Sequence, residues 1–428
     1  MKASGSVRAG ALGIADQVLL SAGNLLAGLA LARELEPSAF GVYVIAFAVS
    51  LAGASVQLSL VTDPLMVLGA ARSGDDRARY LASLLRVQVW VCLAVAAATG
   101  LAAMAAGLAS AAGLSAALAG VALATVPCHL QTFFRAVFFT RLRTGAVFAN
   151  DLIFTLLRLA GLGALMMAGA LTPFRAILAG GAAAMVAAIV ALPLCRDFLG
   201  ARGSVRDTWS AHWGYGRWLL ATAGAYWCSG QAPTLIASGI LSPVAAAVMK
   251  ACQYLVAPLN VAFNGLDGVL APRAARVLVE RGKPALSRFL GLFTAAAVGA
   301  VGLYAVIVLP AAPWIMEVVY KGRYTGYVPI VAVLLLDALL GAACRPSILR
   351  LKVLADTRGI FVGYLWSAMT GLSCLILLAP SMGVMGAALA APISSGTLLL
   401  YLTIVGRPGI ATAVDGRRRA GSPAVIEP

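Results

Sequence analysis

The lysines and arginines of this chain alternate from one gap between apolar stretches to the next. Of the 32 basic residues, 26 lie in the N-terminal stretch, in every second gap or in the C-terminal tail. The intervening gaps hold only Arg33, Arg175, Lys321 and Arg323. Because basic residues are retained on the cytoplasmic side during insertion, this pattern predicts a multi-pass protein of a bacterial inner membrane with both termini in the cytoplasm.

Twelve apolar segments separate these gaps, and each is long enough to cross a hydrocarbon core of ~30 Å at ~20 residues per helix. We therefore predict an all-α polytopic membrane protein of about 12 transmembrane helices. The gaps between the segments are short, so none is expected to fold as a separate domain. The expected spans are 11–32, 40–61, 84–107, 115–134, 147–167, 177–194, 218–240, 245–269, 289–309, 328–343, 360–378 and 384–404.

The composition agrees with a membrane protein and excludes several other classes. Hydrophobic residues make up 61% of the chain and charged residues 11%, too few charges for a soluble protein of 428 residues. The net charge of +16 is mostly topogenic and faces an anionic leaflet. Without a soluble domain to carry it, nucleic-acid binding is not predicted. Asp16 and Gln17 interrupt the first apolar run, which favours a retained helix over a cleaved signal peptide.

Neither a metal, a cofactor nor a catalytic centre is predicted. The seven cysteines are scattered singly without a Cys-x-x-Cys pair, as small buried hydrophobic residues are. The two histidines are too few for a His-based cluster. A membrane enzyme would need convergent acid, base or metal groups, and the sequence offers none, so we predict that the chain is not an enzyme.

The chain repeats a short turn sequence. Residues 35–43, Leu-Glu-Pro-Ser-Ala-Phe-Gly-Val-Tyr, precede the second span, and residues 241–249, Leu-Ser-Pro-Val-Ala-Ala-Ala-Val-Met, precede the eighth. Asp63-Pro64 and Ala271-Pro272 then close these two spans at similar distances. An even number of helices per half gives parallel repeats, an arrangement used by rocking transporters. We predict a six-helix lobe over residues 1–200 and a second over 201–428.

Two cations fall inside predicted spans, where insertion scales assign them at least ~2.5 to 3.5 kcal/mol. Arg158 lies about twelve residues into its span, near the bilayer centre, and Lys250 lies near the external end of its span. Such residues usually face protein or water. Arg158 forms either a structural ion pair or a ligand contact, and Lys250 either snorkels to the interface or faces a cavity.

Intramembrane acids and amides supply further candidates. Asp337 is expected near the middle of the tenth span, either as the partner of Arg158 or as a protonatable site, and Asp16 lies about two turns into the first span. Gln17 and Asn24 belong to a polar stripe on the first helix, and Gln231 to one on the seventh. Such stripes bind neighbouring helices or line a wet cavity. Their place on the first helix of each half favours the cavity.

These turn sequences resemble those of the polysaccharide-transporter branch of the multidrug/oligosaccharidyl-lipid/polysaccharide (MOP) exporter superfamily, the flippases of O-antigen and exopolysaccharide repeat units. The resemblance implies two six-helix lobes around a central cavity, the MATE/MOP-like fold, with alternating access. It extends over the whole chain, although its motifs are short. In the first motif, residues 32–43, Gly41 and an aromatic residue open the second span. The other motifs are residues 243–247, Leu270-Ala271-Pro272-Arg273 and Tyr320-Lys321-Gly322-Arg323-Tyr324.

The resemblance implies a lipid-linked oligosaccharide on undecaprenyl diphosphate as substrate. Its multiply negative head group cannot cross hydrocarbon unaided, and a cation in the cavity lowers the free energy of transfer. We therefore expect Arg158 and Lys250 to contact the head group, and Gln17, Asn24 and Gln231 to bind sugar. Membrane lipids, a polysaccharide polymerase and a chain-length complex are the partners that such a role implies.

Two other functions stay open. In a proton- or sodium-coupled multidrug or organic-cation antiporter of the same superfamily, cavity carboxylates bind cations or exchange protons, a role open to Asp16 and Asp337. The balanced or positive central charge and the 7% aromatic content weigh against it. A scaffold protein of a polysaccharide-synthesis complex would need no polar cavity. The glycan, the coupling ion and the oligomeric state are not predicted.

Overall fold

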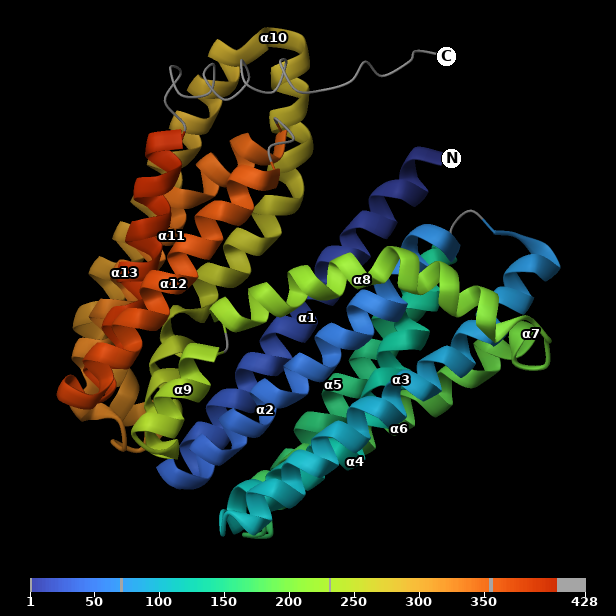
Figure 1. Cartoon of the computed structure of the whole chain (residues 1–428), viewed down its shortest axis with the longest axis horizontal. Helices are drawn as coiled ribbons and strands as arrows, with labels where there is room; N and C mark the ends of the chain where they lie inside the picture. Colours follow the sequence, from blue (N-terminus) through green and yellow to red (C-terminus); the bar gives the residue numbers. More distant parts are fainter. Residues whose placement is uncertain (1, 70–71, 231, 354–356, 406–428) are drawn as a thin grey trace. The chain divides into compact units, whose positions relative to one another are not determined.

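A computed structural model describes residues 2–69, 72–230, 232–353 and 357–405, and every regular element in them is a helix (Figure 1). Contacts divide the chain into two compact units. The first comprises Met1–Tyr254 and Val319–Arg323, and the second comprises Leu255–Val318 and Tyr324–Pro428. The lobe boundary at residue 200 stays a prediction.

The first unit opens with six long helices. Proline at the first turn starts α2 and α6, where its missing N–H is no loss. The Thr172 hydroxyl caps α6 by accepting a hydrogen bond from the Arg175 amide at 3.2 Å. The six helices are α1 (Lys2–Glu34), α2 (Pro37–Gln57), α3 (Gly74–Leu108), α4 (Ala112–Thr140), α5 (Thr144–Met167) and α6 (Pro173–Ala191).

Irregular helical turns follow α2 and α6. Two π-helical segments, η1 (Leu58–Thr62) and η2 (Leu65–Gly69), continue α2, and a 3₁₀ turn η3 (Leu192–Cys195) with the short α7 (Arg196–Leu199) continues α6. Then come α8 (Val205–Gly230), α9 (Ala232–Ile240) and the first part of α10 (Pro243–Tyr320). The segment predicted as one span over 218–240 falls in α8 and α9, on either side of Gln231, which lies outside the described residues.

A buried histidine fastens α8 to two earlier helices. His212 Nδ1 donates a hydrogen bond to the Leu60 carbonyl in η1 at 2.9 Å, and its Nε2 accepts one from the Tyr80 hydroxyl of α3 at 2.7 Å. A Cβ at Gly216 would lie 2.5 Å from the Ser59 carbonyl oxygen, so α8 and η1 approach closely. Burial holds the pKa of His212 below its usual value. The hydrogen bond that His212 donates to the Leu60 carbonyl opposes this effect, and the nearby Arg72 guanidinium adds to it.

The second unit contains most of α10, with η4 (Thr325–Tyr327), α11 (Val328–Val353), α12 (Thr357–Met382) and α13 (Val384–Val405). Gly282, with φ 73°, breaks α10 in the left-handed region that glycine tolerates. The break falls in the predicted connection between the eighth and ninth spans, whose other described residues are helical. The helices α12 and α13 pack closely, because a Cβ at Gly386 would lie 2.2 Å from the Leu378 carbonyl oxygen.

Within the described residues, eleven helices are long and apolar enough to cross a membrane. Large apolar side chains, including those of Trp90, Leu101, Leu303 and Leu377, are exposed on the helices, as lipid contact requires. Beneath this surface, the first unit buries an aromatic and aliphatic cluster that includes Phe133, Phe134, Phe138, Leu81 and Leu84. The predicted polytopic all-helical class is confirmed.

The two turn sequences that suggested a repeat meet inside the first unit. A Cβ at Gly41, near the start of α2, would lie 1.8 Å from the Pro243 carbonyl oxygen at the start of α10. Only a residue without a side chain fits such an approach. The two turns therefore pack backbone against backbone.

Candidate functional site

A cavity of about 350 Å³ lies among α1, α2, α4, α5 and α6 of the first unit. Apolar side chains such as Phe47 and Phe154 form part of its lining, and polar groups project from all of these helices except α6. The cavity therefore combines a hydrocarbon-like lining with charges and hydroxyls. Its polar lining residues are Asn24, Tyr43, Ser50, Thr125, His129, Gln131, Thr132, Arg135, Asp151 and Arg158.

Arg135 of α4 binds two buried carboxylates. Its Nη2 donates to Asp16 Oδ2 of α1 at 2.7 Å, and its Nε donates to Asp151 Oδ2 of α5 at 2.5 Å. The carboxylate side chains are only 3% and 1% exposed, against 26% for Arg135. Arg135 therefore ties α1, α4 and α5 together at one end of the cavity.

Two amides complete this network. Gln131 Nε2 donates to Asp151 Oδ1 at 2.7 Å and to Asn150 Oδ1 at 2.9 Å. Asn150 Nδ2 donates in turn to the Ala187 carbonyl of α6 at 2.8 Å. Buried polar groups that are fully hydrogen-bonded adopt one arrangement, so the Asp151 carboxylate has a fixed orientation.

Arg158 carries the other positive charge of the cavity, and its partner is neutral. Its Nη1 donates to Asn24 Oδ1 of α1 at 2.6 Å. In the described part of the chain, no carboxylate forms an ion pair with Arg158. The helices approach closely here, because a Cβ at Gly23 would lie 2.5 Å from Thr155 Cγ2. Arg158 therefore presents a charge that an anion can bind.

The structure brings only some of the predicted site residues together. Arg158 and Asn24 share the cavity, whereas Gln17 is exposed and donates to the Ser21 hydroxyl at 3.4 Å. Lys250 is not among the cavity residues, and its Nζ lies 5.5 Å from the centroid of the Tyr254 ring. Gln231 lies outside the described residues.

The two predicted coupling acids have different partners. Asp337 of α11 accepts a hydrogen bond from the Ser395 hydroxyl of α13 at 2.6 Å, within the second unit. Asp16 of α1 pairs with Arg135. Asp151, two helical turns before Arg158 in α5, pairs with Arg135 and not with Arg158.

Arg135 is the main residue that sequence reasoning missed. The fourth span was predicted to end at Phe134, which placed Arg135 among the topogenic charges of the following gap. The helix instead continues to Thr140, because the apolar residues Val137 and Phe138 remain buried after the arginine. Gln131 and Arg135, four residues apart, would have marked a polar face of α4.

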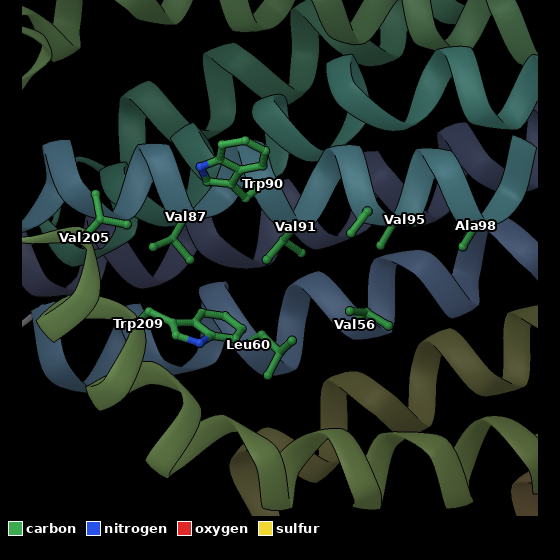
Figure 2. A pocket seen from close by; sticks show the side chains of 10 residues that line it. Val56, Leu60, Val87, Trp90, Val91, Val95, Ala98, Val205 and Trp209 are labelled. Carbon is green, nitrogen blue, oxygen red and sulfur yellow. The ribbon is translucent and has the colours of Figure 1, made fainter.

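A separate groove of about 520 Å³ lies on α2, η1, α3 and α8. Figure 2 shows the row of Val87, Val91 and Val95, with Trp90 on one side and Trp209 on the other. The lining contains no charged residue and suits a hydrocarbon chain better than a sugar. The groove shares no lining residue with the polar cavity.

No protein-family model matches the sequence, and no curated protein matches it significantly. Solved structures do resemble it. The lipid II flippase MurJ, in an inward closed conformation, is 13% identical with a TM-score of 0.63, over 94% of this chain and 87% of that chain. An inward-facing multidrug resistance MATE family transporter of the MOP superfamily is 10% identical with a TM-score of 0.74, over 95% of this chain and 96% of that chain.

A MOP superfamily transporter from Pyrococcus furiosus, described as having a binding pocket of reverse polarity, is 10% identical with a TM-score of 0.62, over 95% of this chain and 96% of that chain. The fold is thus that of a polytopic helical transporter. More particularly, it is the fold seen in solved transporters of the MOP superfamily, as the resemblance of the turn sequences had implied.

Proposed function

We propose that this protein flips undecaprenyl-diphosphate-linked oligosaccharide repeat units across the bacterial inner membrane. Two lobes, predicted over residues 1–200 and 201–428, would alternate access to the substrate site, with both termini in the cytoplasm. The repeat units would serve a polysaccharide polymerase and chain-length complex in O-antigen, capsule or exopolysaccharide synthesis.

The observation that carries this proposal is the neutral partner of Arg158. A guanidinium at membrane depth that forms no ion pair with a carboxylate retains its full charge for a ligand. Guanidinium groups bind phosphate oxygens with paired, charge-assisted hydrogen bonds, and a diphosphate offers several such oxygens. The amide of Asn24 and the hydroxyls of Ser50 and Thr132 in the same cavity are suitable partners for sugar hydroxyls.

The similarity to MurJ, a lipid II flippase, supports a lipid-linked substrate. The reverse polarity stated for the Pyrococcus furiosus pocket indicates that the fold accepts binding pockets of opposite charge. Lys250, with an aromatic ring beside it, remains a proposed second contact for the head group. Gln17 and Gln231 remain proposed sugar contacts.

A flipping assay in proteoliposomes tests the proposal. An undecaprenyl-diphosphate-linked oligosaccharide is the probe, and its accessibility on each side of the vesicle is measured over time. We expect Arg158→Gln to slow flipping by ~10- to 100-fold, because a hydrogen bond to a charged group contributes about 1.5–3 kcal/mol. Arg158→Lys should retain part of the activity. Arg175→Gln, which removes an arginine outside the cavity, should leave the rate unchanged.

An antiporter is the second candidate, and the pairing of Asp16 and Asp151 with Arg135 favours it. Protonation of either carboxylate would free Arg135 to change partner, which is one way to couple protons to movement. Export of a cationic dye, with no flipping of a native lipid-linked glycan, would support this function. A proton-coupled mechanism also predicts that Asp16→Asn or Asp337→Asn alters the pH dependence of transport. Unchanged pH dependence in the double variant contradicts that coupling.

A further inference from the structure

A second polar pocket, of about 470 Å³, lies where four helix ends meet in the first unit. We define the arginine pocket by its seven lining residues. They come from the start of α3, the turn between α4 and α5, η3 and α7. The residues are Arg77, Arg141, Arg143, Pro193, Leu194, Arg196 and Asp197.

Only one of the four guanidiniums is neutralised. Arg141 binds Asp197 with two parallel hydrogen bonds, Nη1 to Oδ1 at 3.0 Å and Nη2 to Oδ2 at 2.8 Å. Its side chain is 6% exposed, and its guanidinium also lies over the Phe198 ring. Arg141 therefore forms a fixed floor of the pocket.

The remaining three arginines form no ion pair with any residue that the structure describes. Arg143 and Arg196 are exposed and Arg77 is half-buried. Three like charges around one pocket repel each other, so an anion that binds among them lowers the electrostatic energy of the pocket. A phosphate group, whose oxygens accept hydrogen bonds from several guanidiniums at once, fits that requirement.

A strained backbone turn between α4 and α5 positions two of the four arginines of the pocket, Arg141 and Arg143. Leu142 adopts φ 56°, a conformation that side chains other than glycine rarely take. The turn is closed by hydrogen bonds from the Leu142 amide to Phe139 O at 2.9 Å and from the Arg143 amide to Phe138 O at 3.0 Å. The strained turn places Arg141 and Arg143 on either side of an exposed leucine.

Exposed leucines around the pocket indicate the source of the phosphate. Leu142 is 86% exposed, and Leu192, Leu194 and Leu199 beside Arg196 are exposed as well. The pocket lies at the ends of membrane-spanning helices, on the side predicted to be cytoplasmic, where head groups meet hydrocarbon. Leucines beside arginines match a ligand with a charged head and an apolar tail. We propose that the arginine pocket binds the phosphate head group of an anionic membrane lipid, independently of the polar cavity.

Thermal unfolding of the purified, delipidated full-length protein tests this site. Phosphatidylglycerol, zwitterionic phosphatidylcholine and inorganic pyrophosphate are titrated separately, and Tm is followed by tryptophan fluorescence. Phosphatidylglycerol should raise the Tm of the wild type by several degrees, because a ligand of the folded state stabilises it. Phosphatidylcholine should not. A shift caused by pyrophosphate but not by phosphatidylglycerol would assign the pocket to a soluble phosphate and overturn the lipid site.

The matched variants separate the pocket from general surface charge. Arg77→Gln/Arg143→Gln/Arg196→Gln should lose the shift. Arg202→Gln/Arg206→Gln/Arg217→Gln, which removes the same charge outside the pocket, should keep it. An equal shift in both triple variants overturns the proposal. If the first triple variant does not fold, the single variants Arg143→Gln and Arg196→Gln, at exposed positions, should each weaken binding measurably, and wild-type affinity in both overturns it.

Discussion

Arg158 of α5 donates a hydrogen bond to the Asn24 side chain of α1 at 2.6 Å, and thus keeps its positive charge unneutralised inside the polar cavity. An aspartate at the same position on α1 would have formed an ion pair. The choice of an amide there orients the guanidinium without cancelling its charge.

Asn24→Asp is therefore expected to slow transport without damage to the fold. The new carboxylate would pair with Arg158 and remove the charge available to an anionic head group. Flipping should fall as far as in Arg158→Gln, while Tm stays at or above the wild-type value. Asn24→Ala, which leaves the cation, should show a smaller loss. Wild-type flipping by Asn24→Asp would contradict the role given to Arg158.

Arg135→Gln is expected to destabilise the protein strongly. It leaves the carboxylates of Asp16 and Asp151 buried without their cation, and breaking a buried ion pair in this way typically destabilises by about 3–5 kcal/mol. The partial exposure of Arg135 favours the lower end of that range. The measurement is Tm in detergent.

Removal of the stranded charges supplies the control for Arg135. The triple variant Arg135→Gln/Asp16→Asn/Asp151→Asn should recover most of the lost stability, because no uncompensated charge remains buried. If its Tm equals that of Arg135→Gln alone, packing rather than charge explains the loss.

Stability should fall in mild acid because of His212. Its pKa is lowered in the folded protein, so the unfolded chain binds more protons. The stabilisation is complete above the unfolded pKa of about 6.5 and is lost as the pH falls below it, by up to about 1.4 kcal/mol per pH unit. Between pH 7.5 and 5.5, the Tm of the wild type should therefore decrease more than that of His212→Gln. Equal decreases would assign the acid sensitivity to other groups.

Gly41→Ala is expected to destabilise the first unit. Its Cβ would meet the Pro243 carbonyl oxygen at 1.8 Å, a backbone atom that cannot rotate away. Overpacking of this kind typically destabilises by about 1–3 kcal/mol. Gly163→Ala in α5 is the matched control, because nothing lies within 4 Å of its Cβ position. It should be neutral or slightly stabilising, and similar Tm values for both variants would argue against the close contact.

The helices could be predicted from the sequence because long apolar runs and alternating charge carry the signal. Among the described residues, eleven helices are long and apolar enough to span a membrane, against twelve predicted spans, and several extend beyond their predicted ends. The helix α4 shows why ends are hard to predict. An arginine normally marks the membrane boundary, but Arg135 is retained within the helix by carboxylates from α1 and α5. Such partners come from distant parts of the chain, so a hydrophobicity pattern does not reveal them.

Only part of the candidate site could be predicted, because the contacts that complete it also join distant parts of the chain. Arg158 stood out as a lone charge in an apolar run, and Asn24 as a member of a polar stripe. Their hydrogen bond depends on the close approach of α1 and α5 at Gly23, which no local pattern indicates. The arginine pocket was equally hidden, because its four arginines were all counted as topogenic charges.

The attachment of α8 through His212 and Gly216 has a mechanical consequence. The helix α8, which opens the second predicted lobe, is fixed at its first turns to η1 and α3 of the first predicted lobe. If the lobes rock, the strain of that motion must be taken up beyond Gly216.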